Sequence, residues 1–187
     1  MLNMTTDAVE IRHRNTFSIG MMIGLSSWAL IFFTLLWGYV VFRMRTDSWI
    51  GAALTQHAVV AAVLNTVVIA LSSWCLSLAF KDNVRRPEMW IRNAFAFGAC
   101  FLLGQFYLWQ VMLREGLHWQ TSTAGSMFFL LTGFHALHIL GALSAVLWLG
   151  LRFKSWRGTL TAKGIKYFWD FLLGVWMIMF VLIFIVQ

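Results

Sequence analysis

Two histidines lie three residues apart near the middle of a long apolar segment. They are His135 and His138, at the end of the run GSMFFLLTGFHALH that occupies residues 125–138. Imidazole binds metals and carries protons near neutral pH. In a helix that rises about 1.5 Å per residue, both side chains lie roughly 15–20 Å from residue 125, close to the centre of a hydrocarbon layer about 30 Å thick. Ionisable side chains at that depth indicate a functional site by default.

The placement of the other histidines argues against a metal or haem site in this chain. Two imidazoles that bind one haem normally come from two helices, whereas residues three apart share one helix face. His13, His57 and His118 lie at or beyond the ends of the apolar segments, and no other segment carries Asp, Glu or His near its centre. A metal centre in a bundle requires three or more such ligands. We therefore interpret His135 and His138 as neutral side chains, hydrogen-bonded inside a helix bundle.

Other polar residues within the apolar segments favour the same interpretation. Asn65, Gln105 and Thr132 each lie on a different segment, and such groups bridge membrane helices for about 0.6–2 kcal/mol each. Asp170 is the one acid inside an apolar segment, and it follows Lys166 by four residues. We expect an ion pair with Lys166 or a capping role near the start of a helix, rather than a role in proton transfer.

Five long apolar segments position these residues. The sequence has 187 residues, of which 60% are hydrophobic and 11% charged, whereas soluble domains are about 25% charged. Each segment is longer than the roughly 18 residues that indicate a spanning helix, and the five occupy residues 16–42, 57–80, 93–113, 125–151 and 167–186. The sequence therefore predicts an all-α integral membrane protein. Its single domain, 16–187, is a bundle of five transmembrane helices, preceded by a short segment at 1–15 that lacks the pattern of a cleavable signal.

The basic residues predict the orientation of this bundle. Eleven Lys and Arg residues lie in segment 1–15 and in the second and fourth connections, against three on the other side. Basic loops stay inside, so we expect a cytoplasmic N-terminus and a C-terminus outside, in the periplasm. Tryptophans near the segment ends suit an aromatic belt: Trp49, Trp90, Trp119 and Trp156.

Two further properties have ordinary explanations in a membrane protein. The net charge of +7 comes from the short connections, so we expect no binding to nucleic acid. Cys75 and Cys100 both fall inside apolar segments, and we interpret them as small buried side chains rather than as a disulfide or a metal pair.

The segments resemble subunit III of the haem–copper terminal oxidases over about residues 16–186. The run at 125–138, with Thr132 and both histidines, is close to that family's Gly-Ser-x-Phe-Phe-x-x-Thr-Gly-Phe-His-x-Leu-His pattern. Leu64-Asn65-Thr66 is similar to its second helix, and Gln105 followed by Trp109 to its third. Phe168-Trp169-Asp170-Phe171 and the later Trp176 are similar to its last helix. The likeness is to the short five-helix bacterial form.

Four positions at which that family carries acidic or histidine residues differ here. Trp28 stands at its first-helix glutamate and Leu108 at its helix-3 glutamate. Asp170 stands at its helix-5 histidine and Leu173 at its helix-5 aspartate. If the chain is a subunit III, these replacements favour a structural role over a role in proton traffic.

The resemblance implies a non-catalytic subunit of a respiratory oxygen reductase, in the bacterial cytoplasmic (inner) membrane. Haem and copper are then expected in partner subunits I and II, with none in this chain. Phospholipid is expected in a cleft between helix groups, subunit I is expected to be stabilised, and a respiratory supercomplex is a candidate larger assembly. The alternatives are a subunit III-like partner of a nitric oxide reductase and, in a different class, a small membrane transporter. The lack of an internal repeat and of midplane charge argues against the transporter.

Overall fold

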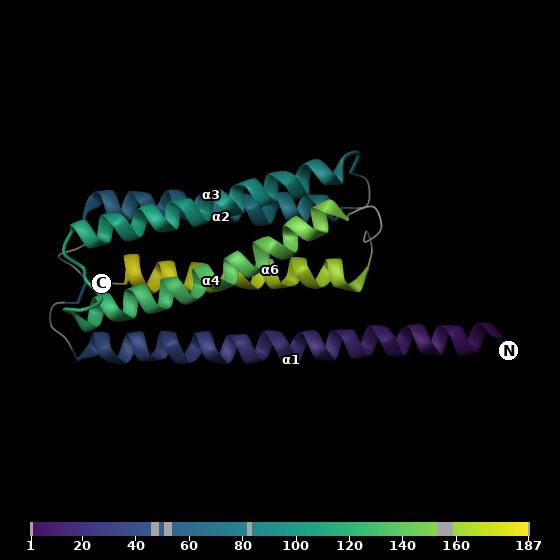
Figure 1. Cartoon of the computed structure of the whole chain (residues 1–187). Coiled ribbons are helices and arrows are strands. Elements are labelled where there is room, and N and C mark those ends of the chain that lie inside the picture. Colours follow the sequence, from purple (N-terminus) through teal and green to yellow (C-terminus); the bar gives the residue numbers. More distant parts are fainter. Residues whose placement is uncertain (1, 46–48, 51–53, 82–83, 153–158, 187) are drawn as a thin grey trace.

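Five long helices make up the described part of the chain (Figure 1). The computed structural model describes residues 2–45, 49–50, 54–81, 84–152 and 159–186, and at 2–11, 13 and 14 it describes the backbone alone. The helices are α1 (Leu2–Met44), α2 (Gln56–Ala79), α3 (Pro87–Arg114), α4 (Thr123–Leu151) and α6 (Leu160–Phe180), and α6 continues as a π-helical turn, Val181–Ile185. All five are long and apolar enough to cross a membrane. The prediction of an all-α bundle with five transmembrane helices is confirmed.

Short polar sequences set where the helices begin and end. Thr55, Ser122 and Thr159 precede α2, α4 and α6, and each hydroxyl accepts a hydrogen bond from the backbone N–H three residues later, as a helix cap does. Pro87 opens α3, a position where its missing N–H would have no helical partner. Gly116, with φ of 88°, follows α3 and ends it in the left-handed region that favours glycine.

Three helices begin earlier than the apolar segments predict. α1 begins at Leu2 instead of residue 16, α3 at Pro87 instead of 93, and α6 at Leu160 instead of 167. Apolarity marks the part of a helix that suits lipid, whereas backbone hydrogen bonding continues through polar turns until a cap or a proline intervenes. The segment expected at 1–15 is continuous with α1 from Leu2 onward.

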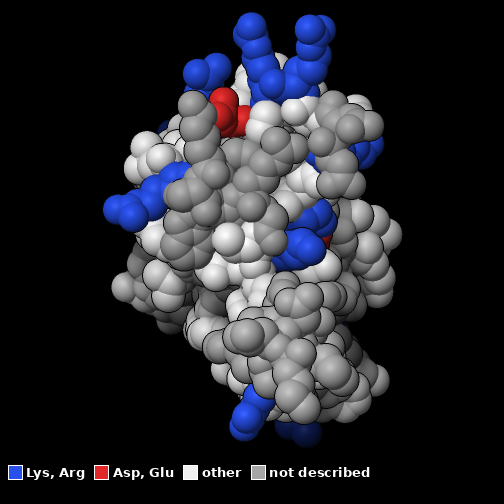
Figure 2. Space-filling model, turned by 90° about the vertical axis from the view of Figure 1, so that its right-hand side faces the viewer, with Lys and Arg blue, Asp and Glu red and all other residues white. Residues whose placement is uncertain are grey.

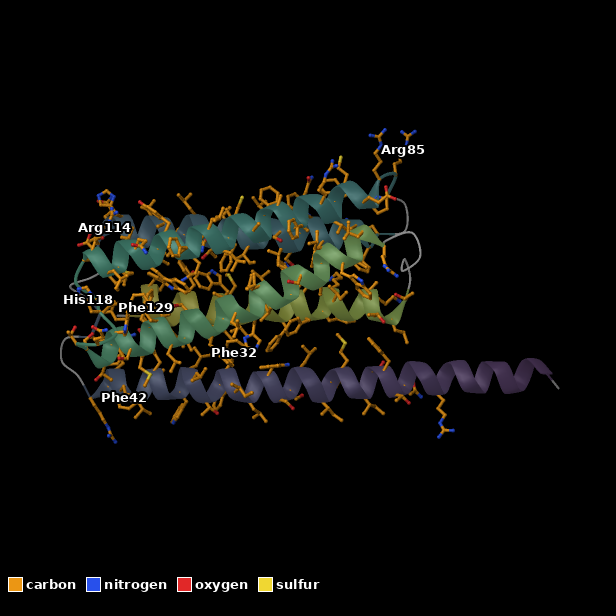
Figure 3. The ribbon with its side chains drawn as sticks, in the orientation of Figure 1. Phe32, Phe42, Arg85, Arg114, His118 and Phe129 are labelled. Atoms are coloured by element: carbon orange, nitrogen blue, oxygen red, sulfur yellow. The ribbon has the colours of Figure 1, made fainter. Side chains whose placement is uncertain are left out.

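The helices form a layered bundle with α1 on the outside (Figure 1). α2 and α3 pack closely together, α4 and α6 lie in the middle, and the main contacts of α1 are with α4 and α6. The most apolar part of α1 is 11% buried, against 33% or more in the other helices. The buried side chains of α1 include Phe32, Leu36 and Tyr39, and Phe32 points into the bundle (Figure 3).

Two glycines let α3 approach its neighbours closely. A Cβ atom at Gly98 would lie 2.7 Å from Leu143 Cδ1 of α4 and 2.7 Å from the Trp169 ring of α6. A Cβ atom at Gly104 would lie 2.3 Å from the Asn65 side-chain oxygen of α2. Small residues are enriched at such contacts in membrane bundles because they bring helix backbones together.

Basic side chains gather at the end of the bundle where α1 begins (Figure 2). The exposed basic residues near the helix ends on this side include Lys81, Arg85, Arg86, Arg92 and Arg152. The two termini lie at opposite ends of the bundle (Figure 1). Lys154, Trp156 and Arg157, which contributed to the sequence-based orientation and belt, lie outside the described residues. The orientation in the membrane stays a prediction.

Candidate functional site

His135 lies at the centre of the bundle, enclosed by aromatic rings from three other helices. Its side chain is 0% exposed. The imidazole stacks on Trp176 of α6, with centroids 5.6 Å apart and planes at 28°. Phe101 of α3 and Phe32 of α1 meet it edge-on at 6.1 and 6.0 Å. His135 therefore connects α4 to α1, α3 and α6 through ring contacts.

The hydrogen bonds expected for His135 are not formed. Neither Nδ1 nor Nε2 has a hydrogen-bond partner among the described residues. The prediction of a hydrogen-bonded side chain is wrong at this position, because the surrounding residues are aromatic rings that offer no acceptor in reach. A buried imidazole in such surroundings favours its neutral form, since an unpaired charge there is costly.

His138 lies closer to α1 than His135 does, since both rings contact Phe32 and His138 also contacts Trp28. Its Nδ1 lies 2.7 Å from the carbonyl oxygen of Phe134 on its own helix. Its ring meets the edge of Trp28 at 4.4 Å and that of Phe32 at 5.3 Å, both on α1. Here the expected hydrogen bond is present, within α4 itself. The pair of histidines thus contacts α1 on one side and the core on the other.

Polar side chains link the helices in pairs around these histidines. The Asn65 amide of α2 donates to the Gln105 side chain of α3 at 3.4 Å, and both residues are buried. Trp109 Nε1 of α3 donates to Thr132 Oγ1 of α4 at 3.0 Å. In turn, Thr132 donates to the Phe128 carbonyl on its own helix at 2.7 Å. These bonds join α2 to α3 and α3 to α4.

Trp176 has a second role besides its stacking on His135. Its Nε1 donates to Thr66 Oγ1 of α2 at 2.9 Å. The same indole ring meets Phe101 edge-on at 5.0 Å. Trp176 therefore ties α6 to α2, α3 and α4 at one level of the bundle. Sequence reasoning placed Trp176 and Thr66 in separate family patterns, and only the packing of α6 against α2 brings them together.

Asp170 joins α6 to α2. Its carboxylate pairs with Lys166 at 2.5 Å and accepts a hydrogen bond from Ser73 at 2.6 Å. The ion pair with Lys166 is the one that the spacing predicted. A capping role is excluded, because α6 begins at Leu160 and Thr159 provides its cap. Asp170 is thus a partly exposed link between α6 and α2.

Apolar side chains occupy the three positions where the family resemblance would place other acids. Leu108 is fully buried in the core. Leu173 packs against the core from a partly buried position. Trp28 lies against His138. At these three positions the side chains can pack against neighbours but cannot exchange protons.

Two further side chains differ from the sequence-based picture. Cys75 is buried as expected, but Cys100 is exposed on α3, because its position faces away from the other helices. Arg43, which no pattern singled out, donates to the Leu182 carbonyl at 3.2 Å and to the Val186 carbonyl. Its guanidinium satisfies backbone carbonyls at the end of α6 and fastens α1 to the last turn of the chain.

The described residues contain no cluster of three or more His, Cys, Asp and Glu side chains arranged to hold a metal. What the arrangement can do is hold helices together. Hydrogen bonds and stacked rings connect α2, α3, α4 and α6 at successive levels, and each interhelical bond contributes about 0.6–2 kcal/mol.

Similar proteins share one name across distant bacteria. A Nocardia farcinica protein named probable cytochrome c oxidase subunit 3 is 31% identical over 186 residues, which cover 95% of this chain and 92% of the relative. Cytochrome c oxidase subunit 3 of Corynebacterium diphtheriae is 31% identical, with 92% and 89% covered. That of Thermostichus vulcanus is 29% identical, with 89% and 86% covered. No protein-family model matches the chain.

Proposed function

The chain belongs to the cytochrome c oxidase subunit 3 family, and from this premise we propose that it is the non-catalytic subunit III of a respiratory haem–copper oxygen reductase. The observation that carries the proposal is a likeness that runs through all five helices and covers nine-tenths of both chains. The chain is a multi-pass membrane protein, and the proposed site is the bacterial inner membrane, with the N-terminus in the cytoplasm.

Support for a non-catalytic role comes from the interior of the bundle. The two midplane histidines contact aromatic rings and a backbone carbonyl, so each is engaged in packing. Leu108, Leu173 and Trp28 stand where the family resemblance would place acids. Electron transfer and oxygen reduction would then occur at haem and copper in partner subunits I and II, and this chain would act on their stability.

The outer surface suits both a partner subunit and lipid. Large apolar side chains remain exposed on every helix, among them Trp37, Trp74, Leu103, Leu137 and Ile178. An apolar groove of 390 Å³ runs between α1 and α6, lined by residues such as Phe33, Trp37 and Ile178. We propose that part of this surface packs on subunit I and shields the flank of that subunit. Lipid acyl chains would cover the rest of the surface. In a respiratory supercomplex, some of the apolar surface that does not contact subunit I would contact a neighbouring complex instead of lipid.

Purification through a tag on this chain tests the proposal. Membranes are solubilised in a mild detergent, the co-purifying chains are identified, and an absorption spectrum is recorded. We expect oxidase subunits I and II together with haem bands. Co-purification with a nitric oxide reductase would instead favour the alternative within the same superfamily. Isolation of the chain without any haem protein, and with solute flux in vesicles that contain it alone, would refute the proposal in favour of a transporter.

A further inference from the structure

His138 has one ring nitrogen without a hydrogen-bond partner. Its Nδ1 lies 2.7 Å from the Phe134 carbonyl oxygen. A carbonyl oxygen can only accept, so in the neutral ring Nδ1 carries the proton and Nε2 is a hydrogen-bond acceptor. Among the residues that the structure describes, none donates to Nε2. The side chain is partly exposed, and Nε2, unlike both nitrogens of His135, is not enclosed.

This acceptor lies at the depth of the hydrocarbon layer. His138 is near the middle of α4, Thr123–Leu151, roughly 20 Å from either end at about 1.5 Å per residue. Trp28, whose ring centroid lies 4.4 Å from that of His138, is near the middle of the apolar part of α1, Asn15–Met44. Lipid acyl chains offer no hydrogen-bond donor, so an acceptor that faces them is left unsatisfied at a cost in free energy.

Two glycines leave open space beside His138. Gly24 lies about one turn before Trp28 on α1, and Gly141 lies about one turn after His138 on α4. The two helices run in opposite directions (Figure 1), so both glycines lie on the same side of the contact between Trp28 and His138. A Cβ atom at either glycine would contact nothing beyond its own helix backbone within 4 Å. Both positions therefore leave room for a side chain from another helix.

We propose that His138 Nε2 accepts a hydrogen bond from a side chain on a transmembrane helix of subunit I. The donor is a hydroxyl, a carboxamide or an indole N–H, and it enters the open space beside Gly24 and Gly141. The inference names the part of this chain that meets subunit I, so it rests on the proposed function. It assigns that contact to α1 and α4, at the middle of the membrane.

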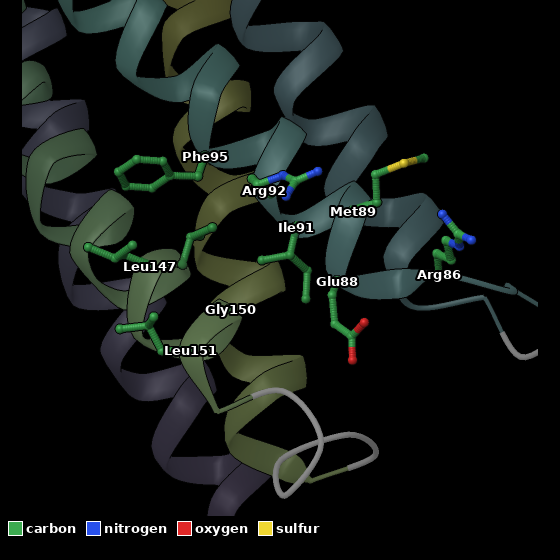
Figure 4. A pocket seen from close by; sticks show the side chains of 10 residues that line it. Arg86, Glu88, Met89, Ile91, Arg92, Phe95, Leu147, Gly150 and Leu151 are labelled. Atoms are coloured by element: carbon green, nitrogen blue, oxygen red, sulfur yellow. The ribbon is translucent and has the colours of Figure 1, made fainter.

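The depth of His138 excludes a lipid headgroup as the donor. Headgroups lie at the membrane surfaces, the level at which the helices end. One such end is marked by a pocket of 460 Å³ that Arg86 and Arg92 of α3 line together with Gly150 of α4 (Figure 4). Gly150 is roughly 18 Å along α4 from His138, at about 1.5 Å per residue. A polar group at that level does not reach Nε2, whereas a side chain on a spanning helix does.

The burial of α1 favours a different subunit as the partner. The most apolar part of α1 is 11% buried, against 33% or more in the other helices. Membrane helices associate through packing and interhelical hydrogen bonds, so a helix with few contacts in its own chain gains most from a neighbouring subunit. A second copy of this chain offers less, because the exposed hydroxyls of Ser27 and Ser144 already donate at 2.9 Å to carbonyls of their own helices.

The test measures how tightly the complex holds subunit I. The complex is purified through a tag on this chain and diluted in micelles, and the fraction of subunit I that stays with the tag gives a dissociation constant. His138→Leu should raise that constant about 3–30-fold, the effect of losing one interhelical hydrogen bond. His138→Gln also loses the ring but keeps an acceptor, so it should hold subunit I more tightly than His138→Leu does. Benzoylphenylalanine in place of Trp28 should crosslink to subunit I on irradiation.

Ser144→Ala is the matched control, because Ser144 is exposed on α4 and its hydroxyl donates to the Leu140 carbonyl of the same helix. It should hold subunit I as the wild type does. Equal dissociation constants for His138→Leu and Ser144→Ala would overturn the inference. Equal weakening by His138→Leu and His138→Gln would also overturn it, since the effect would then belong to ring packing.

The crosslink decides the identity of the partner, and it still decides if His138→Leu does not assemble. Crosslinks from position 28 to a second copy of this chain, or to phospholipid alone, would overturn the inference. Failure of the proposed function looks different, because the wild-type preparation would then contain no subunit I and no haem bands.

Discussion

The contact between Gly104 of α3 and Asn65 of α2 yields a quantitative prediction. Alanine at position 104 would place its Cβ 2.3 Å from the Asn65 side-chain oxygen. The Asn65 amide is buried and hydrogen-bonded to Gln105 at 3.4 Å, so it cannot move away without weakening that bond. Gly104→Ala therefore forces either a shift of α3 away from α2 or a rearrangement of the buried amide pair.

Two costs add in this variant. Overpacking a tight site destabilises by about 1–3 kcal/mol. The hydrogen bond between Asn65 and Gln105 is long, so its loss contributes near the low end of the range for interhelical bonds in membranes, about 0.6 kcal/mol. We expect the free energy of unfolding to fall by about 1.6–3.6 kcal/mol relative to a control that carries the same change in helix propensity.

The measurement is unfolding of the full chain in mixed micelles by a titration with sodium dodecyl sulfate, followed by tryptophan fluorescence. Gly141→Ala is the control, because nothing lies within 4 Å of its added Cβ. Asn65→Ala provides a second background, in which the clash partner is gone and the cost of Gly104→Ala should largely disappear. The reasoning is refuted if Gly104→Ala and Gly141→Ala are equally stable, or if the cost persists undiminished when Asn65 is alanine.

Four further outcomes follow from the structure and the proposed function. Asp170→Asn should cost about 1 kcal/mol or less in the same unfolding assay, because its partly exposed pair with Lys166 is worth little; a loss of 3 kcal/mol or more, on the order of a broken buried pair, would contradict this. His135→Leu should leave the haem absorption of the purified complex unchanged, and a missing haem band in an assembled complex would point to ligation. In a variant without native cysteines, Val84→Cys should react with an impermeant thiol reagent only in permeabilised cells and Thr121→Cys also in intact cells; the reverse pattern would invert the topology. Removal of this chain from the complex should leave initial oxygen reduction largely intact and shorten the working life of the enzyme, whereas immediate loss of turnover with the haems in place would reveal a direct catalytic role.

The number and approximate position of the helices could be predicted from the sequence because membrane helices have a long, uninterrupted apolar signature. The helix starts could not be read from the same signal. α3 begins at Pro87 and α6 at Leu160, and both first turns contain charged or polar residues that lower the apparent apolarity without disturbing the backbone. Pro87 and the cap at Thr159 predict these two helix starts better than apolarity does, since they mark where backbone hydrogen bonding starts.

The candidate site was predictable as a set of residues but not as a set of contacts. Asn65, Gln105 and Thr132 stood out because polar groups in apolar segments need partners. Which partner each one finds depends on how the helices are arranged, and the pairing of Trp176 with Thr66 joins residues 110 positions apart. His135 was expected to be hydrogen-bonded on general grounds. The rings of Phe101 and Trp176 fill its surroundings instead, and no local pattern in the sequence encodes that.

The attachment of α1 has a consequence for how the protein is made. α1 is synthesised before α4 and α6, yet its main contacts are with those two helices, and Arg43 bonds to a carbonyl 139 residues later in the chain. At roughly 5–20 residues per second, this leaves α1 without its final neighbour for about 7–28 s of synthesis. During that interval a mostly apolar helix must be held by lipid, by the insertion machinery or by another subunit. Completion of α6 is therefore the event that closes the bundle, and a chain truncated before α6 would leave α1 with α4 as its one main neighbour.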